Sequence, residues 1–369
     1  MRCGGAERVA STLITDWATS GHEISLFTWS NAETDFFPVP AEIKRYGLNQ
    51  NSPSKHAVDA VRRNIKRIKY LRETIRAIAP DVIVSFMDGN NIISILASCF
   101  LNIPIVISER SNPARPGIPL PWRLLRRATY HFADALVVQS GATADWAKKT
   151  FPGVPCYVFP NPLSTEILSS AEATCNSAAG EADFRPRKKK EVVLAVGRLA
   201  PEKQFDKLIE CFAQLAPGFP NWQLVIVGDG PEKAKLQAAI AASAHSQQFL
   251  LTGAITRPAP MFAESQVFVL CSRFEGFPNT LIEAMAHGTV PITFATTGGV
   301  SEIIEHQVTG FITPDGNWPL LRDELRRVMN DTALLASVGN AASIDVLRRF
   351  KISAIAPRWL QLFRELTNE

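Results

Sequence analysis

Four segments in the carboxyl-terminal half of the chain share one pattern: an apolar run of strand length, a loop that contains glycine, and then a helical segment. They cover residues 192–215, 222–240, 266–286 and 290–304. Repetition of this pattern is typical of a parallel sheet with crossover helices. Because ligands bind beyond the carboxyl ends of the strands in such sheets, the pattern predicts that all four loops lie at one binding edge.

Two carboxylates lie eight positions apart in residues 275–286, which read EGFPNTLIEAMA. Pro278 favours a turn, Asn279 is a good N-cap, and the apolar positions that follow predict a helix. Glu275 is therefore expected in the loop and Glu283 in the first turns of the helix, on either side of N–H groups that can hold an anion. A helix-start charge at Glu283 and a solvated Glu275 are the alternative interpretation.

Two cations, Arg198 and Lys203, lie in the loop of the first segment. Two cations in a strand-to-helix loop suit a diphosphate, whereas a solvated pair of surface charges is the simpler alternative. The Gly298-Gly299 loop would reach the same edge of the sheet. The convergence of these features with the two glutamates indicates one anionic ligand that carries several hydroxyls, such as a nucleotide-sugar.

With these motifs, the chain resembles the retaining glycosyltransferases of family 4, which have the GT-B fold. The resemblance runs from GGAERVA at Gly4 through ISERSNP at Ile107 to the last helix. It is closest to members that extend polyprenyl-diphosphate-linked or other cell-surface glycans. It implies an α/β chain with two Rossmann-like domains that face a cleft. It also implies transfer of a hexose or N-acetylhexosamine from a nucleotide-sugar, with a UDP-sugar favoured, to a glycan acceptor that is lipid-diphosphate-linked.

The resemblance also implies roles for individual residues. Arg198 and Lys203 would hold the donor diphosphate, Glu283 the ribose hydroxyls, and Glu275 a hydroxyl of the transferred sugar, so that Glu275, Arg198 and Lys203 form the catalytic group. The expected donor-binding residues are Gly4, Gly5, Arg198, Lys203, Gly253, Glu275, Phe277, Asn279, Thr280, Leu281 and Glu283. The expected acceptor-binding residues are Glu109, Arg110, Arg62, Arg63, Lys66 and Arg67.

Two positions depart from the family pattern. Gln204 stands where many relatives have glycine after the lysine, and Ser108 precedes Glu109 where many relatives have histidine. No Asp-x-Asp motif is present, so no metal is expected on the diphosphate, and no cofactor is expected because the nucleotide-sugar is a substrate. The cations and helix amides would stabilise the leaving group electrostatically. The resemblance implies front-face displacement with retention, in which the leaving phosphate helps to deprotonate the acceptor and Glu275 orients the sugar without acting as a nucleophile.

Turn residues and shifts in composition along the chain predict its domains. An acceptor-binding Rossmann-like domain is expected over 1–163, a linker or surface loop rich in Ser, Ala and Glu over 164–190, and a nucleotide-sugar-binding Rossmann-like domain over 191–350. The terminal helix over 351–369 is expected, from the resemblance, to cross back to the first domain.

Positive charge gathers in the first domain. Residues 1–160 carry 19 Lys and Arg against 13 Asp and Glu, a net charge of +6, in a chain with a total of +4. Residues 57–79 predict a basic amphipathic helix with Val58, Val61, Ile65, Ile68, Leu71, Ile75 and Ile78 on its apolar face. Residues 121–140 place Arg123, Arg126 and Arg127 among Trp122, Leu124 and Leu125. Such segments suit an anionic membrane surface or a lipid diphosphate, and core-packing helices with solvated basic faces are the alternative.

Several classes of protein are disfavoured. There is no signal-peptide-like start and no apolar run of bilayer length, and the six cysteines form no C-x-x-C pair. We therefore expect a cytoplasmic protein that is peripheral at the inner face of the cell membrane. Nucleic acid is not an expected partner, since no recognition motif is present.

Three other functions stay open. An epimerase acting on a nucleotide-sugar is the nearest enzyme alternative, and a dinucleotide-dependent dehydrogenase is weaker because no G-x-G-x-x-G follows a strand. The third is a truncated, inactive membrane-surface binding protein. It arises because only three residues precede the Gly4-Gly5 turn and the helix with the Val9, Leu13 and Trp17 stripe. A strand should come first, so the first strand of the domain is expected to be missing, with about 10–15 upstream residues supplying it.

Overall fold

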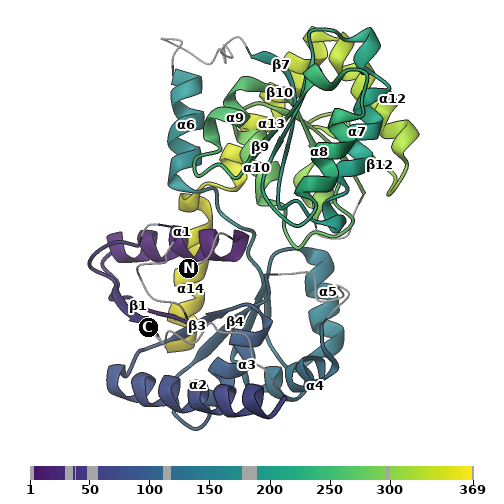
Figure 1. Ribbon diagram of the computed structural model, residues 1–369. Helices are drawn as coiled ribbons and strands as arrows, with labels where there is room; N and C mark the ends of the chain where they lie inside the picture. The colour runs from purple at the N-terminus through teal and green to yellow at the C-terminus, as the bar shows by residue number, and fades with distance from the viewer. Residues whose placement is uncertain are drawn as a thin grey trace. The chain divides into compact units, whose positions relative to one another are not determined.

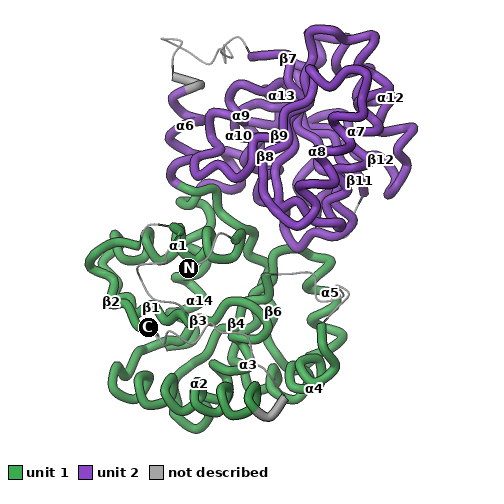
Figure 2. Tube along the Cα trace, viewed as in Figure 1, with its two compact units in different colours: residues 1–164, 352–369 green, residues 165–351 purple. Residues whose placement is uncertain are grey.

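The computed structural model describes residues 4–29, 36–37, 39–47, 57–110, 118–176, 189–295 and 299–367. The chain divides into two compact units, which Figure 2 colours separately. Unit 1 comprises residues 1–164 and 352–369, and unit 2 comprises residues 165–351. Both units are built on parallel strands with helices packed against them, so the predicted α/β class is confirmed. Within these described ranges, no helix combines the length and the apolarity needed to cross a bilayer.

Unit 1 contains two parallel sheets. Its strands are β1 (Ser25–Thr28), β2 (Lys44–Gly47), β3 (Ile83–Phe86), β4 (Ile105–Ser108), β5 (Ala135–Val138) and β6 (Cys156–Val158). Strands β3, β4, β5 and β6 pair in that order, while β1 pairs with β2. The helices are α1 (Gly5–Thr19), α2 (Ala57–Ile78), α3 (Asp88–Ser98), α4 (Leu120–Thr129), α5 (Gly141–Thr150) and α14 (Ile352–Thr367), with a 3-10 turn at Tyr130–Phe132.

Helices α1 and α14 pack against each other over one face of unit 1 (Figure 1). The predicted stripe of α1, formed by Val9, Leu13 and Trp17, is buried. Trp359 of α14 is fully buried, and its ring centroid lies 5.8 Å from that of Trp17 and 5.2 Å from that of Phe159. The last helix of the chain is therefore part of the core of unit 1.

The strands of unit 1 are interrupted between β1 and β3. Leu26 of β1 and Val84 of β3 pack into one hydrophobic cluster, and Phe27 and Ile83 pack into another. The two strands thus contribute to the same two cores, yet in the part of the chain that the structure describes they belong to different sheets. Strands β4 and β5 are buried along their whole length, whereas β1 is only partly buried. The strand expected before Gly4 lies outside the described residues.

The basic amphipathic helix predicted at 57–79 is confirmed as α2. Its carboxyl half buries Leu71 and Ile75 against α3, as the pattern predicts. In the amino half the predicted apolar face is not covered, because Val61 and Ile65 are exposed. The reason is that the hydrophobic cluster with α3 covers only the carboxyl half of this 22-residue helix.

Unit 2 is built on a six-stranded parallel sheet in the order β12-β11-β10-β7-β8-β9. The strands are β7 (Lys190–Val196), β8 (Gln223–Val227), β9 (Phe249–Gly253), β10 (Ser265–Leu270), β11 (Val290–Phe294) and β12 (Phe311–Thr313). The helices are α6 (Thr165–Asn176), α7 (Phe205–Ala213), α8 (Lys233–Ala241), α9 (Ala259–Glu264), α10 (Asn279–Ala286), α11 (Val300–Ile303), α12 (Trp318–Asn330) and α13 (Thr332–Arg349), with 3-10 turns at Pro201–Lys203, Ala216–Gly218 and Ser246–Gln248.

The expectation of a linker over 164–190 is wrong for its first part. Residues 165–176 form α6, which packs against α9 and α10 in unit 2. Ile167, Leu168 and Ala171 are buried, and their spacing gives one apolar face of a helix. The Ser- and Ala-rich composition hid this face, because small residues are read as loop although alanine favours helix. Residues 177–188 lie outside the described ranges.

Candidate functional site

The loops that follow β7, β8 and β10 meet at one edge of the unit 2 sheet. Strand β7 pairs with β10 on one side and β8 on the other, and all three run parallel. Arg198 and Lys203 come from the loop after β7, and Glu275 comes from the loop after β10. Glu283 lies on α10, which follows that second loop. The structure therefore places these four predicted residues on adjoining segments at the carboxyl edge of one sheet.

The loop with Arg198 is held by the glycine-rich turn after β8. A side chain on Gly228 would bring its Cβ to 1.9 Å from the carbonyl oxygen of Gly197, and one on Gly230 would come to 2.4 Å from that of Leu199. Both glycines have positive φ angles. Only glycine permits this approach of two backbones, so the turn fixes the backbone on either side of Arg198.

The side chain of Arg198 is much freer than its backbone. Its guanidinium forms an ion pair with Glu202 at 2.7 Å, but 69% of the arginine side chain is exposed. Exposed pairs four residues apart contribute little to stability. Arg198 is therefore available to another anion at this edge.

Lys203 and Glu275, by contrast, form a largely buried ion pair. The lysine Nζ lies 2.7 Å from Oε1 of Glu275, and the two side chains are only 21% and 12% exposed. The Coulomb attraction between unit charges is stronger where water is largely excluded. Two predicted site residues from different loops are thus in direct contact.

Backbone and side-chain hydrogen bonds tie the same two loops together. Arg273 N donates to the carbonyl oxygen of Glu202 at 2.9 Å, and the thiol of Cys271 donates to that of Lys203 at 3.2 Å. Gln204 has a φ angle of +54°, in the left-handed region, which glycine adopts without strain. The sequence noted Gln204 only as a departure and did not indicate its conformation.

The helix that carries Glu283 begins differently from the prediction. Pro278 is the N-cap of α10 and Asn279 is already its first helical residue, so Asn279 does not cap the helix as predicted. Asn279 and Thr280 are the first two residues of the helix. The Leu281 amide donates to the carbonyl oxygen of Pro278 at 3.0 Å and is therefore engaged.

Glu283 is buried on α10, and a neighbouring histidine holds the end of that helix. His287 Nδ1 lies 2.8 Å from the carbonyl oxygen of Glu283, and Nε2 lies 3.1 Å from Oγ of Ser170 on α6. Because a carbonyl oxygen can only accept, Nδ1 carries the proton. Burial lowers the pKa of His287 to about 4, so the ring is neutral at pH 7 and fixes α10 to α6 without adding charge.

The remaining residues predicted on the donor side differ in how they are held. Gly253 ends β9 with a φ angle of +80°, a conformation that requires little strain only for glycine. Phe277 is buried with its ring 5.8 Å from that of Phe350, so its side chain is occupied in packing. Gly299 is the N-cap of α11, and Gly298 lies outside the described residues.

Glu109 and Arg110 of unit 1 follow β4 and are both buried. Tyr130 donates to Oε2 of Glu109 at 2.9 Å, and Arg110 donates from Nη1 to Oδ1 of Asn161 at 2.5 Å. The Arg110 guanidinium also lies 5.5 Å from the ring centroid of Trp359. Burial lowers the pKa of Arg110 to about 9. Its Nε and Nη2 have no hydrogen-bond partner among the residues described, so this buried cation retains donors for an anionic group.

The prediction that Arg126 belongs to an exposed basic face is wrong. Arg126 is buried, its guanidinium lies 4.9 Å from the ring centroid of Trp146, and Nη1 lies 4.0 Å from Oε2 of Glu109. The helix turns this arginine inward because its charge has a carboxylate and an aromatic face to contact. Arg123 and Arg127 of the same helix are exposed, as predicted.

The other predicted residues of unit 1 lie at its surface. Arg62 and Lys66 on α2 are exposed, whereas Arg63 is paired with Asp59 at 3.0 Å and Arg67 stacks 4.9 Å from the ring centroid of Trp29. Gly4 is the N-cap of α1, and Gly5 is its first residue. A role for these two glycines in binding stays a prediction.

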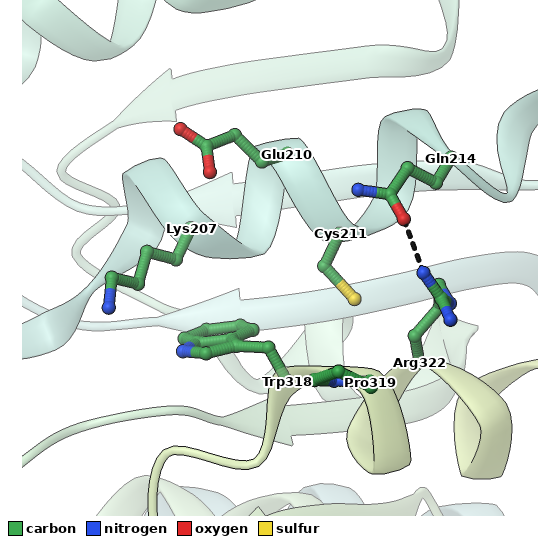
Figure 3. A pocket seen from close by; sticks show the side chains of 7 residues that line it. All are labelled: Lys207, Glu210, Cys211, Gln214, Trp318, Pro319 and Arg322. Atoms are coloured by element: carbon green, nitrogen blue, oxygen red, sulfur yellow. Dashed lines mark hydrogen bonds between the residues drawn. The ribbon is translucent and has the colours of Figure 1, made fainter.

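A cavity of about 280 Å³ lies between α7 and α12, away from the predicted residues (Figure 3). Figure 3 shows Lys207 and Arg322 at its two sides, with Cys211 and the Trp318 ring between them. Arg322 already donates to Gln214, and Trp318 packs edge to face on Phe294. None of the predicted site residues lines this cavity.

Sequence reasoning missed the residues that hold the site together. Gln204 and Arg273 support the loops of unit 2, and Tyr130 and Asn161 hold Glu109 and Arg110 in unit 1. One signal was available: Gln204 departs from the glycine that the resemblance implies at this position. Asn161 offered no such signal, because an Asn-Pro pair already suggests a turn.

Both units match models of known protein families. Residues 3–167 match the model described as Glycosyltransferase Family 4, and residues 180–344 match the model described as Glycosyl transferases group 1. Together the two matches cover nearly the whole chain.

Individual proteins are similar over the full length. A Campylobacter jejuni protein is 28% identical, covering 100% of this chain and 97% of its own. Its name is GalNAc-alpha-(1->4)-GalNAc-alpha-(1->3)-diNAcBac-PP-undecaprenol alpha-1,4-N-acetyl-D-galactosaminyltransferase. Among solved structures, a glycosyltransferase from Rickettsia africae has a TM-score of 0.77 at 17% identity, covering 99% and 95% of the two chains. Anabaena HepE in complex with UDP-glucose has a TM-score of 0.72 at 18% identity, covering 99% and 97%.

Proposed function

The chain belongs to the family 4, group 1 glycosyltransferases with the GT-B fold, and we propose its reaction from this premise. In the proposed reaction, the protein moves a hexose or N-acetylhexosamine from a UDP-sugar to a glycan carried on a lipid diphosphate. The name of the Campylobacter jejuni relative includes an undecaprenol-linked acceptor, and the HepE structure holds UDP-glucose. These two similarities support the choice of donor and acceptor class. Cell-surface polysaccharide or glycoconjugate assembly is the corresponding process.

The observation that carries the proposal is the Lys203–Glu275 ion pair at the carboxyl edge of the unit 2 sheet. In the proposed complex, Lys203 and Arg198 hold the donor diphosphate together with the first amides of α10. Glu275, in contact with Lys203, receives a hydroxyl of the sugar that is attached to that diphosphate. Glu283 on the same helix binds the ribose hydroxyls.

We propose that transfer retains the anomeric configuration. The negative charge that develops on the departing diphosphate is stabilised by the two cations and the helix amides. The departing phosphate takes the proton of the attacking acceptor hydroxyl on the same face of the sugar. Glu275 orients the sugar and does not act as a covalent nucleophile, since its carboxylate is held by Lys203. Transfer that persists in EDTA supports a metal-independent reaction, and a loss that Mg²⁺ restores contradicts it.

On the acceptor side, we propose that Arg110 contacts an anionic group and that Glu109 is held in place for a hydroxyl. Arg110 is suited to this because it is 7% exposed and keeps two guanidinium nitrogens unengaged within the described part of the chain. A buried guanidinium with open donors favours a phosphate or carboxylate. Arg62 and Lys66, which are exposed on α2, would meet the lipid diphosphate or the bilayer surface.

A screen of nucleotide-sugars by thermal unfolding tests the proposed donor. A ligand at 100 times its Kd stabilises the folded state by about 2.7 kcal/mol, which is about 5–10 °C in Tm for a unit of this size. We expect UDP-sugars to raise Tm and ADP- or GDP-sugars to have little effect. Incubation of the stabilising donor with polyprenyl-diphosphate glycans should then yield a longer glycan. A free epimer without any transfer would instead indicate an epimerase.

Two helices of unit 1 support a membrane-peripheral location. Val61 and Ile65 on α2 are exposed beside Arg62 and Lys66. Helix α4 exposes three leucines, Leu120, Leu124 and Leu125, close in sequence to the exposed Arg123 and Arg127. Apolar side chains among cations are typical of a surface that meets anionic lipid. We therefore propose that the protein works at the inner face of the cell membrane.

Neutralising two cations of α2 is expected to weaken membrane binding. Each cation near an anionic surface contributes about 1 kcal/mol, so Arg62→Gln with Lys66→Gln should lower the partition onto anionic liposomes about 30-fold. Co-sedimentation at low and high salt measures this. The matched control is Arg326→Gln with Arg348→Gln, two exposed cations of unit 2. If the wild-type protein does not co-sediment with anionic liposomes at low salt, the membrane part of the proposal is wrong.

A further inference from the structure

Gln204 has a backbone conformation that is sterically unfavourable for a residue with a side chain. Its φ of +54° and ψ of +33° lie in the left-handed region, where a Cβ is crowded by the backbone. Glycine adopts this conformation without that cost. Gln204 is nevertheless only 6% exposed, so its side chain is inside the protein and not in solvent. The folded structure must therefore offset the strain through contacts of this side chain.

The contacts of the Gln204 amide join two loops. In the orientation that satisfies both neighbours, its nitrogen donates to the carbonyl oxygen of Cys271 at 3.2 Å, and its oxygen accepts from Nε of Arg273 at 2.9 Å. Cys271 and Arg273 lie in the loop that leads from β10 to Glu275. The residue immediately before Gln204 is Lys203. The amide thus bridges the segments that carry the two members of the ion pair.

We propose that Gln204 is a positioning residue whose amide clamps the Lys203 loop to the Glu275 loop and thereby fixes the geometry of their ion pair. The clamp acts through those residues and not through direct contact with a ligand, because both ends of the Gln204 amide are engaged with Cys271 and Arg273. Its consequence for turnover rests on the proposed function, whereas its effect on the ion pair does not.

The position of the clamp explains why it matters. Lysine has a long flexible side chain, so the place of its ammonium group depends on how firmly the backbone beneath it is held. Hydrogen bonds from Arg273 N to Glu202 and from Cys271 to Lys203 hold that backbone, and Gln204 adds the only side-chain amide among the described residues that joins the two loops. Misplacement of a reacting group by about 1 Å can slow a reaction on the order of 100-fold.

Three variants separate the clamp from backbone strain. Gln204→Gly removes both the amide and the strain, and Gln204→Asn keeps an amide that tolerates the left-handed region but is too short to reach both neighbours. Gln307→Gly is the matched control, because Gln307 is exposed and also has a positive φ, +67°. Gln307→Gly should raise Tm slightly, as release of strain alone does, and leave turnover unchanged. Gln204→Gly and Gln204→Asn should lower kcat by about 10- to 100-fold while the Kd for UDP changes about threefold or less.

The ion pair itself gives a readout that needs no activity. A double-mutant cycle of Lys203→Ala and Glu275→Ala, measured by urea unfolding, gives the coupling between the two side chains. Repeated in the Gln204→Gly background, the cycle should show that most of this coupling is lost. In the Gln307→Gly background it should be unchanged. Arg273→Ala should mimic Gln204→Gly, and the two changes together should be no worse than either one.

The outcomes are distinguishable from those of the proposed function. Coupling that is the same in the Gln204→Gly background as in the wild type would overturn the clamp, whatever the turnover. Wild-type kcat in Gln204→Gly would overturn its role in the reaction. If the wild-type protein transfers no sugar, the proposed function fails, and the urea cycle still decides whether the clamp exists.

Discussion

Lys203→Ala is expected to lower kcat/KM for sugar transfer by roughly 30- to 1,000-fold, which corresponds to about 2–4 kcal/mol of lost transition-state stabilisation. The reason is that a preorganised cation is removed from the place where negative charge develops on the leaving diphosphate. Initial-rate kinetics with the donor found by the thermal screen measure the loss. Near-normal transfer by this variant would show that Lys203 does not hold the phosphate.

The same substitution should also destabilise the protein. Truncation of Lys203 leaves Glu275 largely buried beside no cation, and for a pair that keeps some solvent contact this costs about 1–2 kcal/mol. Tm should then fall by about 2–8 °C. Arg198→Ala should lose activity to a similar extent without a change in Tm, because Arg198 is exposed. Lys203→Ala combined with Glu275→Gln should recover Tm, since the buried charge is gone, but not activity.

Glu283→Gln and Glu275→Gln are expected to affect different steps. Loss of a charge-assisted hydrogen bond to ribose should weaken UDP binding by Glu283→Gln about 10- to 100-fold, or about 1.5–3 kcal/mol. Glu275→Gln should leave the Kd for UDP within about threefold of wild type while kcat falls at least tenfold, because Glu275 meets the sugar that UDP lacks. Titration calorimetry with UDP and steady-state kinetics with the UDP-sugar separate the two effects.

Glu264→Gln is the matched control for both changes. Glu264 pairs with Lys190 at 2.6 Å beside the amino end of β7, opposite to the edge that carries the site. This variant should bind UDP and transfer sugar as the wild type does. If Glu275→Gln and Glu283→Gln weakened UDP binding equally, the division of roles between sugar and ribose would be wrong.

The fold could be predicted well where periodicity alone determines the structure. The stripe of α1 and the parallel strands of unit 2 follow from apolar spacing, because each has one or two faces that must leave water. The amino half of α2 has the same spacing, yet Val61 and Ile65 are exposed. Spacing tells which residues share a face, but whether another helix covers that face depends on distant parts of the chain.

The site was predicted at the level of loops and less well at the level of contacts. Sheet topology requires Lys203 and Glu275 to come from loops at one edge, and the structure places them there. Their direct contact depends on side-chain lengths and on Gln204, whose left-handed backbone no propensity indicates. The burial of Arg126 could not be predicted from the sequence either. It depends on Glu109 and Trp146, which only the fold brings close to its guanidinium.

Because β1 and β3 are not paired in the described part of the chain, the two sheets of unit 1 are expected to differ in their free energy of local opening: β1–β2 on one side and β3–β6 on the other. Strands β4 and β5 each have a neighbour on both sides. Among the residues described, β1 and β2 are joined by a single ladder and by the side chains that β1 shares with two cores. A two-stranded sheet is marginal by itself, so we expect these two strands to open at a lower free energy than β4 and β5. Opening there would leave β3 to β6, and with them Glu109 and Arg110 after β4, in place.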